Sequence, residues 1–146
     1  MSIDEADYVS KPTAAQSYLD VDREMLPGAK HLVGIDSISS QAPTFLCGHI
    51  CECALKSILS FNGKSEKELK DSSIRHNILG LWNEVCNLTQ ELDNPPQDWV
   101  SQLSRVFNAP HVVRYAKGAN FVVFSDQWAM INGTENLVSL AAQIIE

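Results

Sequence analysis

The feature that most constrains the fold is a long apolar stripe with helical spacing between residues 43 and 63. Pro43 suits the first turn of a helix, and Gly63 is typical of a helix end. Between them the apolar residues recur mostly at intervals of three and four, which is the period of one helix face. The stripe consists of Leu46, Ile50, Ala54, Leu55, Ile58 and Leu59. We therefore expect a helix that starts near Pro43 and ends near Gly63.

Further segments carry the same helical period on one face. These segments are 13–35, 72–92, 96–109 and 132–146. We expect the first of these helices to be interrupted or kinked near Pro27, and we expect Ser73 and Asn132 to cap the third and last helices of the chain. Ser65 and Glu68 have the spacing of a capping box over a short connector. An all-α antiparallel bundle of four to five helices is the economical way to bury these faces.

Residues 111–125 differ from the rest of the chain, because β-branched and aromatic runs flank "AKGAN" there. This pattern predicts a small hairpin or an extended segment. A chain of 146 residues that is 45% apolar is long enough for one domain with its own core. We expect an N-terminal tail at 1–11 and a single helical domain at 12–146.

The stretch "CGHICEC" at 47–53 concentrates three cysteines and one histidine. Within a helix, Cys47 and Cys51 lie on one face while His49 and Cys53 lie on another. No second Cys or His pair follows at a zinc-ribbon spacing. We therefore expect no metal site and no cofactor, and we interpret these cysteines as small core residues.

Composition and missing motifs exclude several classes of function. A net charge of −7 disfavours a general nucleic-acid surface, because such surfaces neutralise phosphates with Lys and Arg. The chain has no Gly-rich phosphate loop, no Gly-x-Ser-x-Gly elbow and no His-Glu-x-x-His motif. The acidic N-terminus and the absence of a long apolar run predict a cytoplasmic protein that does not contact a membrane.

The two central helices carry a recognisable pattern of short motifs. They are Glu-x-x-Leu-Lys at 52–56, the turn glycine Gly63, and His76-Asn77 at the start of the next helix. This pattern resembles the HEPN superfamily, and Arg114-Tyr115 looks like the Arg-Tyr pair of some members. The resemblance covers roughly residues 12–145 and is strongest over 42–85.

The resemblance implies an all-α bundle that is commonly a homodimer. Many members of the superfamily are metal-independent endoribonucleases of toxin–antitoxin, phage-defence or RNA-processing systems. Others are non-catalytic partners of nucleotidyltransferases, or nucleotide-binding modules. The expected partners are therefore a second copy of the chain, a nucleotidyltransferase or antitoxin protein, and RNA.

The catalytic branch of the family has an Arg followed four to six residues later by a His, and the match in this chain is Arg105 to His111. In such a site the His acts as general base or acid, and the Arg stabilises the developing phosphorane charge. Val106 stands where the family usually has a polar residue, and Pro110 takes His111 off the helix that carries Arg105. We therefore place the ribonuclease below a binding role.

The resemblance also implies a polar or ligand-binding site formed by Glu52, Lys56, His76, Arg114 and Tyr115. From spacing alone, Glu52 and Lys56 form a solvated helix pair worth about 0.3 to 0.5 kcal/mol. His76 alone is interpreted as a residue with local contacts at a helix start. If the pair is buried and points toward His76 or Arg114, the polar site is favoured.

Taken together, these patterns predict a HEPN-like interaction or regulatory module linked to RNA or nucleotide systems. A metal-independent endoribonuclease that uses Arg105 and His111 is the first alternative. The second alternative is a structural partner subunit of a larger assembly.

Overall fold

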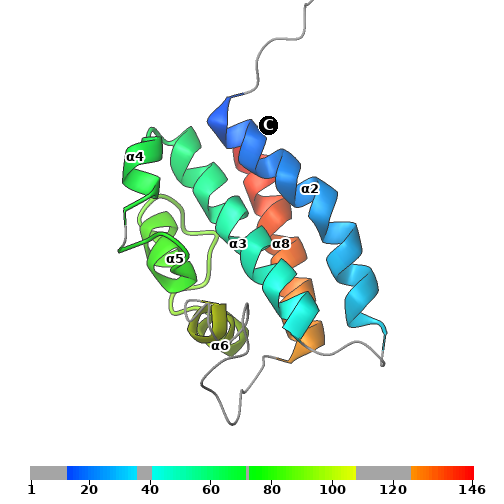
Figure 1. Cartoon of the computed structure of the whole chain (residues 1–146). Coiled ribbons are helices and arrows are strands. Elements are labelled where there is room, and N and C mark those ends of the chain that lie inside the picture. The colour runs from blue at the N-terminus through cyan, green and yellow to red at the C-terminus, as the bar shows by residue number, and fades with distance from the viewer. Residues whose placement is uncertain (1–12, 36–40, 72, 108–125) are drawn as a thin grey trace, which may run out of the picture.

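The computed structural model describes residues 13–35, 41–71, 73–107 and 126–146. In these ranges the regular structure consists of six α-helices and contains no strand, so the predicted all-α class is confirmed (Figure 1). The helices are α2 (Ala14–Val33), α3 (Gln41–Phe61), α4 (Glu66–Leu69), α5 (Ile78–Cys86), α6 (Asp98–Phe107) and α8 (Gln127–Ile145). The predicted hairpin or extended segment at 111–125 lies outside the described residues.

The core is organised around α3, which packs against α2 and α8 on one side and against α5 and α6 on the other (Figure 1). Its apolar stripe is buried almost completely, as its helical spacing predicted. By length and composition α3 is the one described helix that could cross a membrane, but 72% of its most apolar window is buried inside the protein. Such burial is what the central helix of a bundle requires.

The helices are not arranged in a purely antiparallel order, because α3 and α8 run in the same direction. The Gln127 amide donates a hydrogen bond to the Thr44 hydroxyl at 3.5 Å near the start of both helices. One to two turns further along, the Cys51 sulfur lies 3.4 Å from the Thr134 hydroxyl. α2 runs against both, so its neighbours in the bundle are antiparallel to it (Figure 1).

α2 begins at a capping box formed by Thr13 and Gln16, in which each side chain bonds the other residue's backbone N–H. The helix continues through Pro27 without interruption, so of the two predicted outcomes, a break or a kink, the break is wrong. Pro27 lies on the exposed face of α2, where water can satisfy the carbonyl that the proline leaves without a donor.

Two predicted helix starts are also wrong. α5 begins after Asn77, whose side chain accepts a hydrogen bond from Gly80 N–H at 3.0 Å, while Ser73 lies in the preceding turn. α8 begins after Asp126, so Asn132 is inside the helix. In both cases the side chain of another residue, Asn77 or Asp126, accepts the hydrogen bond from the first turn of the helix.

The connection between α3 and α5 agrees with the sequence. α3 ends just before Gly63, whose φ of 98° is a conformation that glycine adopts at little cost. Ser65 and Glu68 then form the predicted capping box at the start of α4. This connection carries the chain back along α3 and leads into the turn before α5.

Candidate functional site

Glu52 and Lys56 of α3 form a buried ion pair, and the partly exposed His76 contacts Glu52 from the turn before α5. The exposed fraction is only 4% for Glu52 and 7% for Lys56. Lys56 Nζ donates to Glu52 Oε1 at 2.8 Å, and His76 Nδ1 lies 2.9 Å and 3.0 Å from the two carboxylate oxygens of Glu52. The pair is therefore not the solvated surface pair that its spacing alone suggested.

The turn before α5 delivers His76 to this cluster. Arg75 N–H donates to the Asp71 carbonyl at 2.8 Å, and Asn77 N–H donates to the Ile74 carbonyl at 3.0 Å. Between these bonds His76 adopts a φ of 61°. Histidine is one of the few non-glycine residues enriched in this left-handed region, and such a conformation persists where its surroundings hold it.

The charge on Glu52 is set by two opposing effects. Burial alone would raise the pKa of Glu52, but the hydrogen bonds from Lys56 and His76 outweigh it, so the pKa is lowered. Glu52 is therefore a carboxylate at neutral pH and only accepts hydrogen bonds, which places a hydrogen on His76 Nδ1. The His76 side chain is 40% exposed. The buried Glu52 and Lys56 thus hold the imidazole of His76 in one orientation, with part of its ring facing solvent.

A tight contact between α3 and α6 completes the wall of the cluster. The Phe107 ring meets the His76 ring edge to face, with 6.3 Å between the ring centroids. The Phe107 ring also packs on Gly48, one turn before Glu52. A Cβ at Gly48 would lie 2.3 Å from the ring. Glycine at position 48 is therefore what allows α6 to approach this part of α3.

The other predicted site residues are only partly placed. Arg105 is exposed in the last turn of α6. His111, Arg114 and Tyr115 lie outside the described residues. The predicted convergence of Arg105 with His111, and the predicted part of Arg114 and Tyr115 in the polar site, therefore remain predictions.

The cysteines of the stretch at 47–53 are core residues, as the sequence predicted. Cys47, Cys51 and Cys53 are all buried, and Cys53 Sγ lies 3.8 Å from the Nε2 of His49. Burial raises the pKa of Cys47 to about 11 and that of Cys53 to about 12, so these thiols keep their protons near neutral pH. No group of three or more potential metal ligands occurs in the part of the chain that the structure describes.

A second buried carboxyl group was missed by the sequence analysis. Asp22 on α2 is 0% exposed, and neither of its carboxyl oxygens has a hydrogen-bond partner among the described residues. Burial raises the pKa of Asp22 to about 9. A signal was present, because Asp22 falls between Tyr18 and Met25 at the spacing of the apolar stripe on α2.

Comparisons of the chain with protein-family models, with curated proteins and with solved structures found no match. Function is therefore inferred from the residues of the site and from the motif resemblance.

Proposed function

We propose that this chain is a HEPN-like interaction or regulatory module that works with RNA or nucleotide systems, such as toxin–antitoxin pairs, phage defence or a nucleotidyltransferase. The observation that carries the proposal is the contact between Glu52, Lys56 and His76. These residues belong to the motifs on which the resemblance rests, and His76 is 24 positions away from Glu52 along the chain. Their contact in the folded chain supports the view that these short motifs together form one site, as the resemblance implies.

The geometry of the cluster favours ligand binding over catalysis. Lys56 is 7% exposed and its ammonium faces Glu52, and His76 Nδ1 is bonded to the same carboxylate, so the cluster offers a ligand little access to either nitrogen. What remains for a ligand is the outer edge of the His76 ring and the exposed Arg75 beside it. A histidine and a neighbouring guanidinium suit a phosphate group, which matches a nucleotide or an RNA backbone.

Fluorescence anisotropy with two probes tests this proposal: a labelled RNA of ten uridines and a labelled ATP analogue. The variant His76→Asn is suited to the test because asparagine tolerates the left-handed backbone at this position. The matched control is His31→Asn, which changes an exposed histidine in the last turn of α2. Circular dichroism establishes that both variants are folded.

We expect at least one probe to bind, with about tenfold weaker binding in His76→Asn and no change in His31→Asn. Loss of about one charge-assisted hydrogen bond accounts for that factor. Equal binding by all three proteins, or no binding of either probe, overturns the assignment of the cluster as a nucleotide or RNA site.

A ribonuclease is the second candidate, favoured by the exposed Arg105, which lies two residues before Phe107 on the helix that contacts the cluster. Total RNA is incubated in EDTA with wild-type protein and with His111→Ala purified in parallel. Cleavage that His111→Ala abolishes replaces the regulatory proposal with a metal-independent endoribonuclease. Absence of cleavage leaves the binding module.

We further propose that the module associates with a second copy of itself or with a partner protein, either an antitoxin or a nucleotidyltransferase. The large apolar side chains that are exposed among the described residues are Phe61, Leu88 and Trp128, and each is a candidate point of contact with a partner. Size-exclusion chromatography with light scattering measures the mass. A mass of one chain at every concentration rejects the homodimer and leaves a role as a partner subunit.

A further inference from the structure

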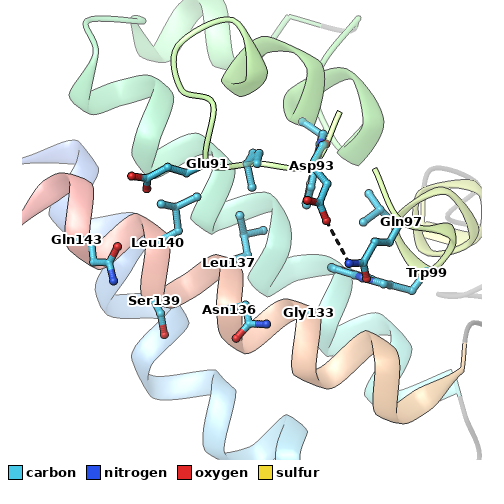
Figure 2. Close-up of a pocket in the computed structure, with 13 residues that line it drawn as sticks. Glu91, Asp93, Gln97, Trp99, Gly133, Asn136, Leu137, Ser139, Leu140 and Gln143 are labelled. Carbon is cyan, nitrogen blue, oxygen red and sulfur yellow. Dashed lines mark hydrogen bonds between the residues drawn. The ribbon is translucent and has the colours of Figure 1, made fainter. Parts of the chain in front are cut away.

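A cavity of about 440 Å³ lies between α8 and the connection from α5 to α6. Figure 2 shows Glu91 and Asp93 on the connection above the cavity, with Leu137 and Leu140 of α8 facing them. Its volume lies in the range of protein cavities that hold ligands. No residue of the Glu52 cluster lines this cavity.

The packing of the helices explains why the cavity exists. α5 and α6 pack against each other and against α3, while α8 packs mainly against α2 and α3. The connection from α5 to α6 is held by Trp82, whose indole N–H donates to the Asp93 carbonyl at 2.8 Å. At the other end Trp99 lies directly on Gly133, where a Cβ would be 2.1 Å from the indole ring. The walls are thus fixed and the space between them stays open.

The floor of the cavity is apolar and aromatic. Trp82 and Trp99 meet edge to face with 6.2 Å between ring centroids. Both indoles are buried, and Val100, Leu137 and Leu140 complete the floor. These apolar side chains, although largely covered, favour an apolar group over a charged one at the floor of the cavity.

Glu91 and Asp93 are the charged residues among the described ones that line the cavity. Glu91 and Asp93 are exposed, and neither forms an ion pair with a described residue. Asp93 Oδ2 accepts one hydrogen bond from Gln97 at 3.1 Å (Figure 2). No Lys, Arg or His is among the described residues that line the cavity, and the chain has a net charge of −7. Nucleotides and RNA are therefore disfavoured here.

We propose that this cavity, called the groove from here on, binds a basic amphipathic segment of a partner protein. The groove is defined by Glu91, Asp93, Gln97, Trp82, Trp99 and Leu140. Leucine-like side chains of the segment lie on the aromatic floor, and its Lys or Arg groups pair with the two carboxylates on the rim. The lining residues on α8 run from Gly133 to Gln143, which is about 15 Å at the rise of an α-helix. That length matches about five residues of an extended segment. The inference rests on the proposed role as an interaction module and names the chemistry of its partner.

The test uses tryptophan fluorescence in a Trp128→Phe background. The chain has three tryptophans, so the two that remain, Trp82 and Trp99, both report on the groove. The probe is a synthetic peptide of fourteen alternating leucines and lysines, and its counterpart has glutamate in place of lysine. No nucleic acid is present, so a failure of this experiment is separate from a failure of the RNA and nucleotide test.

Two double variants separate the groove from overall charge. Glu91→Gln/Asp93→Asn removes the rim carboxylates, and Asp20→Asn/Glu24→Gln removes two exposed carboxylates from α2. Both change the net charge by the same amount. A third variant, Ser139→Arg, places a cation on the α8 side of the groove.

We expect the lysine peptide to shift the indole emission of the background protein and of the α2 control alike. Binding should weaken roughly fivefold to tenfold in the rim variant and in Ser139→Arg, and the glutamate peptide should not bind. Equal weakening in both double variants, binding without a change in emission, or no binding overturns the proposal. The same emission change with spermidine alone would assign the groove to small organic cations and also overturn it.

Discussion

Two buried carboxyl groups lie in this small core, and the structure treats them in opposite ways. Glu52 on α3 accepts hydrogen bonds from Lys56 and His76, and its pKa is lowered. Asp22 on α2 has no hydrogen-bond partner among the described residues, and burial raises its pKa to about 9. Burial disfavours the charged form of both groups and by itself raises both pKa values. Whether the pKa is finally raised or lowered therefore depends on the hydrogen-bond partners.

The contrast is between a buried carboxyl group with hydrogen-bond partners and one without them among the described residues. Charged partners keep Glu52 ionised, and removing one member of such a group leaves the others buried without compensation. Asp22 is buried as a neutral acid, whereas it is ionised in the unfolded chain at neutral pH. Folding must therefore protonate Asp22, and this lowers the free energy of unfolding. We therefore expect substitutions at the two positions to change stability in opposite directions.

The largest effect is expected from Glu52→Gln. The amide keeps the shape of the side chain but removes the charge that faces the Lys56 ammonium, so we expect the free energy of unfolding to fall by about 3 to 5 kcal/mol. Urea denaturation followed by circular dichroism measures it. Glu24→Gln, an exposed position on α2, is the control and should change stability by less than about 0.5 kcal/mol. A loss below about 1 kcal/mol for Glu52→Gln would contradict the buried cluster.

The opposite effect is expected from Asp22→Asn. The amide cannot ionise in either state, so the variant no longer gives up the ionisation of the unfolded chain. With a folded pKa of about 9, we expect stability at pH 7 to rise by about 2 to 4 kcal/mol. The same urea measurement applies. A loss of stability would show that Asp22 makes a favourable contact in the folded protein.

The dependence of stability on pH sharpens the comparison further. The folded pKa of Asp22 is raised, so its contribution is fully present below the unfolded pKa near 4 and is lost as pH rises toward about 9. We expect the stability of the wild type relative to Asp22→Asn to fall by up to about 1.4 kcal/mol per pH unit between pH 5 and 8. Parallel pH profiles of the two proteins would contradict this assignment.

The smallest expected effect concerns the packing around the two groups. Gly48→Ala forces the new methyl group into the Phe107 ring that covers His76, and should cost about 1 to 3 kcal/mol. Gly28→Ala on α2 meets open space and should stabilise the helix by about 0.5 to 1 kcal/mol. Thermal unfolding of both variants measures the difference. Equal effects would show that the α3–α6 contact is looser than described.

The helices that could be predicted from the sequence are those whose apolar stripe is long, above all α3. Glu52 and Lys56 were predicted to be close, because their spacing on a helix dictates it, but their burial depends on α5 and α6, which no local pattern reveals. The left-handed turn at His76 has no signal of its own. Asp22 did have one, since a carboxylate interrupted an apolar stripe.

Helix ends were harder to predict because several capping residues compete near each start. Asn77, and not Ser73, caps α5, and its side chain accepts a hydrogen bond from the backbone N–H of Gly80. α5 packs against α3, and this packing fixes where the helix starts. Tertiary packing decides these cases and leaves no trace in the local sequence.

The long stretch of sequence between α3 and α8 also has a consequence for synthesis of the chain. Cys51 meets Thr134 across 83 positions, and Arg23 meets Glu146 across 123. The N-terminal half therefore leaves the ribosome with one face of α3 still uncovered. Until α8 follows, that face is available to a chaperone or to a neighbouring nascent chain.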